Sequence, residues 1–442
     1  MRITLGVCLC AGLLTAYQAD PDPSEARLQE ANERFRAGQF AEAERLYLEI
    51  AADLEPLKLD DLRRAKAANN LGALYHQTGR YAEAEVLYRQ ALPAYEKLQG
   101  AARGSYAAVL NNLGEVHRVR GRYADAEPYY RKAIAVRESV PSGDKDIAAP
   151  LNNLAVLLNL QLRATEAEPL ARRALEIWEK AHRGEHPHVA SALNTLGETL
   201  RLLGRFSESA ACHRQAVKIR EAVLPADHPE IGAGLSNLGS VLFLEGDFAE
   251  AEELFRRAIA IRAKALGEGH PAVGFLLNNL GTAVQAQGRD IEAENLYRRS
   301  MDILEGAGAA GHSDYAMPVD NLAGIFIKRN KLQGAERLLL RAVEVREKAL
   351  GALHPAIADQ YDSLAVFLAR QARVTEAERY FKRALNIRES VFGPESPEAA
   401  MSLKLLGTFY QIHDRKEQGR DLLRRADSIL KEKPVPGVSS FR

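Results

Sequence analysis

The sequence predicts an all-α fold: a right-handed superhelical solenoid of about ten antiparallel helix pairs. A small residue returns at steps of 41 or 42 residues, apolar residues within each step follow helical spacing, and no segment alternates as a strand does. A unit with this period buries its apolar face only against its neighbours, so the chain should form an array of repeats rather than one large core. The small residues are Ala31, Gly72, Gly114, Ala155, Gly197, Gly239, Gly281, Ala323, Ala365 and Gly407.

A column of larger residues shares this register about sixteen positions later and is often aromatic. Because protein cores alternate large and small side chains, we expect this column to fill the space between neighbouring helices. Its aromatic members are Tyr47, Tyr88, Tyr130, Phe255, Tyr297 and Phe381, and Ala171, His213, Leu339 and Leu423 stand in the other repeats.

One repeat, residues 227–266, shows how each element arises. His228-Pro229 opens it, and proline suits the first helical position because its missing N–H would have no partner there. Residues 231–244 then carry apolar side chains at helical spacing, which predicts the first helix. Gly246-Asp247 breaks that helix, and the second begins at Phe248 with acidic residues that favour the positive end of the helix dipole. It should end near Gly267.

Short motifs in these units carry a family resemblance. N-N-L-G at 69–72, G-R-Y-x-E-A-E at 79–85 and Y-R-x-A-L at 88–92 resemble the tetratricopeptide repeat. The connector L-G-x-x-H-P, at 266–271 and again at 350–355, is similar to that of the kinesin light chain type. The resemblance covers residues 24–432 and implies a general scaffold that binds proteins. We expect no cofactor.

The two ends of the chain differ from the repeats. Residues 1–19 combine Arg2 with an apolar run and a polar break after Ala19, which predicts a secretory signal peptide. The mature chain would then be exported, to the periplasm or the medium, with no membrane span. An uncleaved N-terminal anchor is the alternative. Residues 433–442 form a C-terminal tail.

Charge and cysteine content argue against a nucleic-acid-binding protein and against a protein stabilised by internal disulfides. Lys plus Arg equal Asp plus Glu at 59 each, which argues against nucleic acid as a partner, since phosphate binding needs a concentrated basic surface. Cys8 and Cys10 lie in the predicted signal peptide, so Cys212 alone would remain and no disulfide could form within the mature chain.

Histidines recur at the connectors and raise the question of a metal site. Equivalent positions in adjacent repeats lie at least about 8–10 Å apart, whereas zinc needs each nitrogen at about 2 Å. We therefore interpret these histidines as part of the turns that start helices, and expect no metal. The sequence also lacks a phosphate loop, a nucleophile elbow and an H-E-x-x-H motif, which favours a protein that is not an enzyme. The connector histidines are His186, His228, His270 and His354.

Asparagines in the middle of first helices are the best candidates for a binding site. Asparagine is a mediocre helix former, so its recurrence there needs a reason. In similar repeats the first helix lines the concave groove, where an amide can hold a peptide backbone. The alternative is that these amides bond to adjacent helices and stabilise the stack. The candidates are Asn70, Asn112, Asn153, Asn237, Asn279 and Asn321 in one register, Asn194 in the next, and Arg118 and Arg201 on the same face.

Three connectors depart from the pattern, at 98–105, 139–146 and 306–314. Pro150 and Pro318 follow two of them and lie where other repeats place a first helix. Because proline past the first turn removes a hydrogen bond and clashes with the preceding turn, these helices should start late or kink. The irregular connectors are either tolerated drift or joints that let the array flex.

The sequence thus predicts a scaffold that binds a protein or an extended peptide in its groove. Two other roles stay open. The chain could assemble with copies of itself into a structure, or it could serve as an accessory or sensor subunit of a separate catalytic chain.

Overall fold

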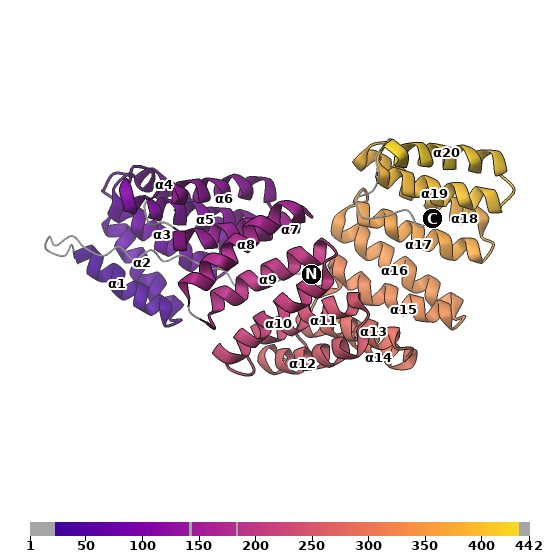
Figure 1. Ribbon diagram of the computed structural model, residues 1–442, viewed down its shortest axis with the longest axis horizontal. Helices are drawn as coiled ribbons and strands as arrows, with labels where there is room; N and C mark the ends of the chain where they lie inside the picture. Colours follow the sequence, from indigo (N-terminus) through magenta and orange to yellow (C-terminus); the bar gives the residue numbers. More distant parts are fainter. Residues whose placement is uncertain (1–22, 141–143, 183, 433–442) are drawn as a thin grey trace. The chain divides into compact units, whose positions relative to one another are not determined.

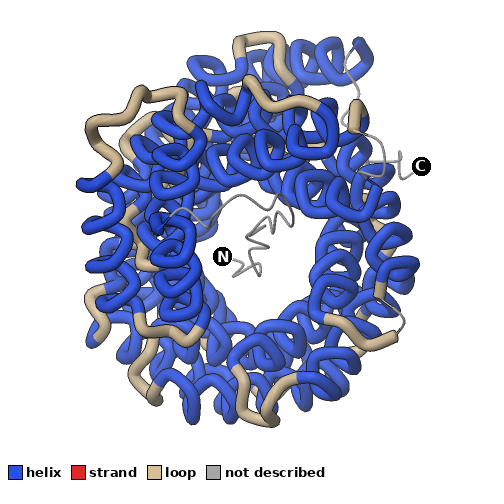
Figure 2. The backbone as a smooth tube through the Cα atoms, turned by 90° about the vertical axis from the view of Figure 1, so that its left-hand side faces the viewer, coloured by secondary structure: helices blue, strands red, loops and turns tan. Residues whose placement is uncertain are grey.

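The computed structural model describes residues 23–140, 144–182 and 184–432. These residues form α-helices joined by short loops and 3-10 turns, with no strand among them (Figure 2). Successive helices pair antiparallel to one another along the chain (Figure 1). The all-α prediction and the predicted number of ten helix pairs are therefore confirmed.

Each repeat consists of a first and a second helix. The first helices are α1 (Pro23–Arg36), α3 (Leu62–Gln77), α5 (Arg103–Val119), α7 (Ala148–Leu160), α9 (Pro187–Leu202), α11 (Pro229–Glu245), α13 (Pro271–Ala286), α15 (Ala316–Lys328), α17 (Pro355–Arg370) and α19 (Pro397–Ile412). The second helices are α2 (Phe40–Asp53), α4 (Tyr81–Glu96), α6 (Tyr123–Glu138), α8 (Ala164–Ala181), α10 (Phe206–Val223), α12 (Phe248–Leu266), α14 (Asp290–Gly306), α16 (Leu332–Leu350), α18 (Val374–Phe392) and α20 (Lys416–Glu432).

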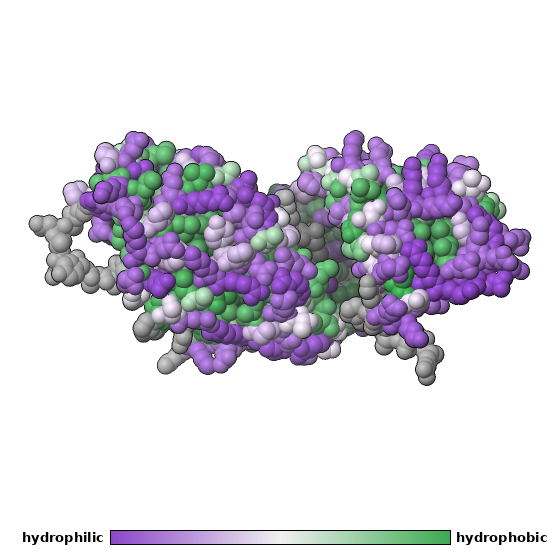
Figure 3. Space-filling view, turned by 90° about the horizontal axis from the view of Figure 1, so that it is seen from above, coloured by the Kyte–Doolittle hydropathy of each residue, from purple (hydrophilic) through white to green (hydrophobic). Residues whose placement is uncertain are grey.

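The chain divides into two compact units. The N-terminal unit contains α1 to α10 and residues 233–245 of α11. The C-terminal unit contains residues 227–232 and α12 to α20. Within each unit the core runs from repeat to repeat as clusters of Ala, Leu, Val and aromatic side chains. Hydrophilic side chains cover most of the visible surface, with hydrophobic patches between them (Figure 3).

The aromatic column packs where the sequence predicts. A methyl group added at Gly114 would lie 2.7 Å from the ring of Tyr130, and one at Gly281 would lie 2.5 Å from that of Tyr297. Both rings are fully buried. The small column therefore exists because the ring of the second helix sits directly on the backbone of the first helix in the same repeat. His213 makes the same contact with Gly197.

The connector histidines cap helices. The Nδ1 atoms of His186, His270 and His354 accept hydrogen bonds from the backbone N–H two residues later, at 3.1, 3.1 and 3.2 Å. Each is followed by a proline at the first helical position. His228 accepts in the same way, at 3.3 Å. Their interpretation as helix-starting turns is confirmed.

The two first helices that contain Pro150 and Pro318 start late, as predicted. α7 begins at Ala148 after the 3-10 turn η2 (Asp144–Ile147). α15 begins at Ala316 after η3 (Ala309–Gly311) and η4 (Ser313–Tyr315). Pro150 and Pro318 thereby fall in the first turn, where a missing N–H loses no intrahelical bond. The first irregular connector forms η1 (Gly100–Ala102) ahead of α5.

The predicted signal peptide, residues 1–19, and the predicted tail, residues 433–442, lie outside the described residues. Among the helices that the structure describes, none is both long and apolar enough to span a membrane.

Candidate functional site

The candidate asparagines lie on first helices, and four of them bond to the preceding first helix. In each case an amide Nδ2 donates to the Oδ1 of another asparagine one repeat earlier. The pairs are Asn70 to Asn32 at 3.0 Å, Asn153 to Asn111 at 3.0 Å, Asn237 to Asn194 at 2.8 Å and Asn321 to Asn278 at 2.9 Å. These bonds link successive repeats, so the asparagines of this register help to hold neighbouring repeats together.

Inter-helix bonding does not use all the polar atoms of this register. A carboxamide has two N–H donors and an oxygen acceptor, and each donating asparagine commits one N–H to its neighbour. Asn112 is buried, and its Oδ1 has no hydrogen-bond partner. Asn279 is half-buried and accepts only a long bond of 3.4 Å from Asn278. Asn112 and Asn279 are therefore the members of this register whose amides are least used by inter-helix bonds.

The two candidate arginines are held by glutamates of their own helices. Arg118 Nε donates to Glu115 at 2.8 Å, and Tyr130 Oη donates to the same carboxylate at 2.8 Å. Burial alone would raise the pKa of Glu115, but the bonds from Arg118 outweigh it and leave that pKa below its usual value. Arg201 likewise donates to Glu198 at 2.9 and 2.6 Å. Both arginines are therefore engaged in ion pairs within their own helices.

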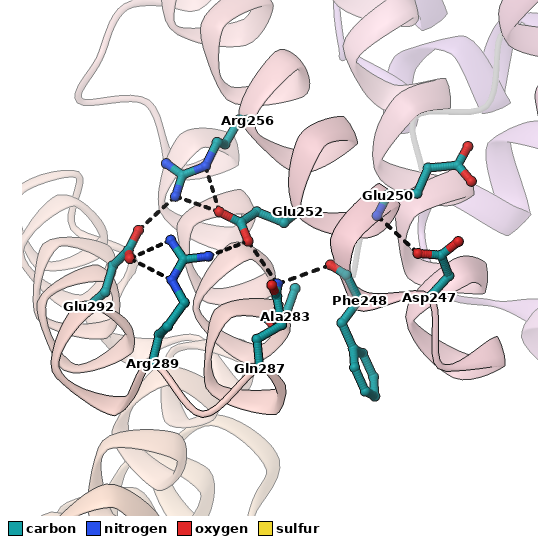
Figure 4. Close-up of polar contacts among 9 residues, drawn as sticks. All are labelled: Asp247, Phe248, Glu250, Glu252, Arg256, Ala283, Gln287, Arg289 and Glu292. Carbon is teal, nitrogen blue, oxygen red and sulfur yellow. Dashed lines mark hydrogen bonds and ion pairs between the residues drawn. The ribbon is translucent and has the colours of Figure 1, made fainter.

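A second recurring polar cluster, which we call the clasp, joins consecutive second helices. Figure 4 shows one example, between α12 and α14. Arg289, the residue before α14, donates to Glu252 of α12 at 2.7 Å and to Glu292 three residues later at 3.0 Å. Arg256 of α12 donates to the same two carboxylates, at 2.8 and 2.7 Å. Two arginines and two glutamates thus alternate in a closed ring of balanced charge.

The bond between an N-cap arginine and the glutamate of the preceding second helix recurs through the chain. It joins Arg80 to Glu44, Arg122 to Glu85, Arg163 to Glu127, Arg205 to Glu168, Arg289 to Glu252, Arg373 to Glu336 and Arg415 to Glu378. In the sequence, the arginine of the G-R-Y motif stands out only as part of the family resemblance. Its 41- or 42-residue recurrence, matched by a recurring glutamate, is the signal that predicts these contacts.

One register position lacks both clasp residues. Ala210 stands in the glutamate position of α10, and Asp247 stands in the arginine position before α12. Asp247 instead caps its own helix, accepting the backbone N–H of Glu250 at 3.1 Å (Figure 4). The division of the chain into two compact units falls at this repeat.

A surface pocket of about 600 Å³ lies beside the clasp in Figure 4. Arg289, Ile291, Asn295 and Arg329 line part of it, and Arg329 donates to Glu294 at 2.7 Å. Ile291 is largely exposed. None of the asparagines singled out in the sequence lines this pocket.

Metal-ligating residue types do not converge in the described ranges: no group of three or more His, Cys, Asp or Glu side chains there could hold a metal ion. Three histidines lie close together, but His182 and His186 present stacked ring faces to each other, with centroids 3.5 Å apart. Cys212 is half-buried, and burial raises the pKa of its thiol, which disfavours the reactive thiolate.

Models of the tetratricopeptide repeat match the sequence at residues 28–97, 63–139, 105–159, 146–222, 230–306 and 360–432, and a second such model matches residues 320–356. These matches cover most of the chain. The chain belongs to the tetratricopeptide repeat family. No curated protein matches it in sequence.

Solved structures of several repeat proteins resemble this chain. BtubC (BKLC) from P. vanneervenii is 25% identical over 54% of this chain and 96% of its own, with a TM-score of 0.46. A putative kinesin light chain from Podosopora anserina is also 25% identical, over 47% of this chain and 99% of its own, with a TM-score of 0.42. A Rap protein complexed with competence and sporulation factor is 16% identical over 83% of this chain and 98% of its own, with a TM-score of 0.55. The last likeness shows a shared fold alone.

Proposed function

We propose that this protein is a non-catalytic scaffold that binds an extended peptide, or an extended segment of a protein, along its first helices. The observation that carries the proposal is the row of asparagines on those helices, whose amides are only partly used by inter-helix bonds. A carboxamide can donate to a backbone carbonyl and accept from a backbone N–H at the same time. Such a row can bind the backbone of an extended chain without specificity for its side chains.

Two further features support this role. Tetratricopeptide repeats form general binding scaffolds, and the solved Rap protein of similar fold holds competence and sporulation factor. We further propose that the protein acts outside the cytoplasm, because residues 1–19 have the pattern of a signal peptide. N-terminal sequencing of the protein from a secreting host tests this second part, and an intact Met1 on the product would contradict export.

The test of the groove uses variants that the structure separates into two classes. Asn112→Ala combined with Asn279→Ala removes amides that inter-helix bonds use little. Asn153→Ala combined with Asn237→Ala removes amides that bond to Asn111 and Asn194, and is the matched control for stability. Each hydrogen bond lost to a ligand should cost about 0.5–1.5 kcal/mol, so the first pair should weaken binding about tenfold.

Binding is measured with a peptide selected from a random library on the mature chain, residues 20–442, by fluorescence anisotropy. We expect the first pair to lose affinity and keep its melting temperature, because alanine is also the better helix former. The control pair should lose stability. Unchanged affinity in the first pair contradicts the groove proposal. Light scattering on the same samples tests the alternative of self-assembly, and a pull-down of the mature chain with mass spectrometry tests that of a catalytic partner.

A further inference from the structure

The clasp between α4 and α6 contains an extra arginine. Glu85 of α4 accepts from Arg120 and Arg122 on one carboxylate oxygen, and its other oxygen pairs with Arg89 at 2.5 Å. The Glu85 side chain is only 5% exposed, whereas those of Arg89, Arg120 and Arg122 are 50%, 36% and 35% exposed. Three accessible guanidinium groups therefore converge on one buried carboxylate.

Comparison with the other clasps shows where the extra charge comes from. The position two residues before the N-cap arginine holds glutamine at 161, 287 and 371, and Gln287 donates to Glu252 at 2.7 Å. Arg120 occupies this position before α6 and makes the equivalent contact with Glu85. It thus adds a positive charge where several other repeats carry a neutral amide.

The same clasp also lacks one carboxylate contact. Elsewhere the Nε of the N-cap arginine donates to the side chain three residues later, as from Arg163 to Glu166 at 2.7 Å and from Arg205 to Glu208 at 2.7 Å. In α6 that position is Asp125, one methylene shorter, which lies 3.6 Å from His117 Nδ1 instead. Arg122 Nε is consequently buried without a hydrogen-bond partner.

The charges around this clasp do not balance. Arg89, Arg120 and Arg122 all pair with the one carboxylate of Glu85, whereas the carboxylate of Asp125 lies beside His117. His117 adds no charge near pH 7, because burial and the neighbouring Arg122 lower its pKa. A buried, unpaired N–H in a group with surplus positive charge favours an added oxyanion, since arginine binds carboxylate and phosphate groups through paired N–H donors.

We propose that Arg89, Arg120 and Arg122 form a site for one oxyanion, a carboxylate or a phosphate group carried by a ligand of this protein. The oxyanion accepts hydrogen bonds from guanidinium N–H groups that do not bond to Glu85. It also brings a negative charge to Arg122 Nε, which the shorter Asp125 does not contact. The site lies on α4, which carries Arg89, and on the turn between α5 and α6, which carries Arg120 and Arg122. It shares no residue with the asparagine register, so it is independent of the proposed peptide groove.

Two substitutions restore the usual clasp without removing its core contacts. Arg120→Gln introduces the residue that other repeats carry at this position and removes the extra charge. Asp125→Glu lets the side chain reach Arg122 Nε, as Glu166 reaches Arg163. The matched control, Glu166→Asp, shortens the carboxylate of a clasp that has glutamine rather than arginine at 161. Circular dichroism checks that each variant is folded.

The probes are inorganic phosphate, acetate and a blocked triglutamate peptide, titrated by calorimetry into the mature chain at constant ionic strength. We expect at least one probe to bind the wild type and the Glu166→Asp control alike, and to bind Arg120→Gln and Asp125→Glu at least tenfold more weakly. Tighter binding of phosphate indicates a phosphorylated ligand, and tighter binding of the triglutamate indicates an acidic protein segment. Equal affinity of all probes for the wild type and both restored variants, or no binding to the wild type, overturns the proposal.

Discussion

Replacing His213 with tyrosine should make the protein more resistant to acid. His213 of α10 stands in the aromatic column, is 1% exposed, and has no hydrogen-bond partner on either ring nitrogen. Burial, with smaller contributions from Arg220 and Arg201, lowers the pKa of this imidazole to about 3. In the unfolded chain a histidine titrates near a pKa of about 6.5.

The sign of the effect follows from these two values. Between about pH 6.5 and pH 3 the histidine binds a proton in the unfolded state, whereas the buried imidazole of the folded state stays neutral. The free energy of unfolding therefore falls as the pH falls. At pH 5 the unfolded histidine gains about 2 kcal/mol from protonation, whereas the buried one gains almost nothing. A side chain that does not titrate there removes this loss.

Tyrosine also suits the site chemically. Tyr130 donates its hydroxyl to Glu115, which lies fifteen residues earlier and pairs with Arg118. Glu198 lies at the same spacing before residue 213 and pairs with Arg201 in the same way. We therefore expect His213→Tyr to gain a hydroxyl bond of about 0.5–1.5 kcal/mol at all pH values, which the comparison variant His213→Phe cannot make.

Urea unfolding followed by circular dichroism at pH 7 and pH 5 measures both effects. Between these pH values the wild type should lose about 2 kcal/mol more than either variant, while other titrating groups act equally on all three. The tyrosine variant should exceed the phenylalanine variant at both pH values. If wild type and His213→Phe show the same loss on acidification, the buried neutral imidazole is not the cause and the reasoning fails.

Two substitutions test other parts of the packing. Gly114→Ala places a methyl group 2.7 Å from the Tyr130 ring and should destabilise by about 1–3 kcal/mol in thermal unfolding, whereas Gly324→Ala, with no atom within 4 Å, should be neutral or stabilising. Arg388→Ala removes the guanidinium that donates to Asp362 at 2.6 Å and leaves a buried carboxylate, a loss of about 3–5 kcal/mol at pH 7. Burial raises the pKa of Asp362 to about 6 although Arg388 lowers it, so the loss of Arg388 should raise this pKa further. The folded variant then takes up a proton more readily than the wild type as the pH falls, and its deficit should shrink at pH 5; an equal deficit at both pH values would contradict this account.

The sequence predicts the fold well because the same pattern of small, aromatic and helix-ending residues recurs in successive repeats. Gly114 and Tyr130 are informative together: one must be small because the other covers its backbone, and the pair recurs at 72 and 88 and at 281 and 297. The late starts of α7 and α15 follow from single prolines for an equally local reason, the missing N–H. Repetition turns weak local preferences into a firm prediction.

The binding face is harder to predict, because a side chain's role depends on which neighbour it meets. The sequence marks Asn153 and Asn112 as equivalent, yet Asn153 donates to Asn111 while the oxygen of Asn112 is left without a partner. The glutamates that hold Arg118 and Arg201 are visible in the sequence, but their pairing depends on side-chain geometry within a turn. Periodicity identifies a register of equivalent residues, but it does not show which of their side chains bond to neighbouring helices.

Departures from the register are for the same reason the most informative positions. At His213 a titrating ring replaces a tyrosine, and at Asp125 an aspartate replaces the longer glutamate. Each change is conservative by residue class, yet one creates a buried imidazole without partners and the other orphans an arginine N–H. Both are recognised only by comparison with the repeats in which the same contact is complete. In a repeat protein the other repeats serve as an internal reference. A polar atom that lacks its usual partner in one repeat marks a candidate position for ligand binding or for a pH-dependent change in stability.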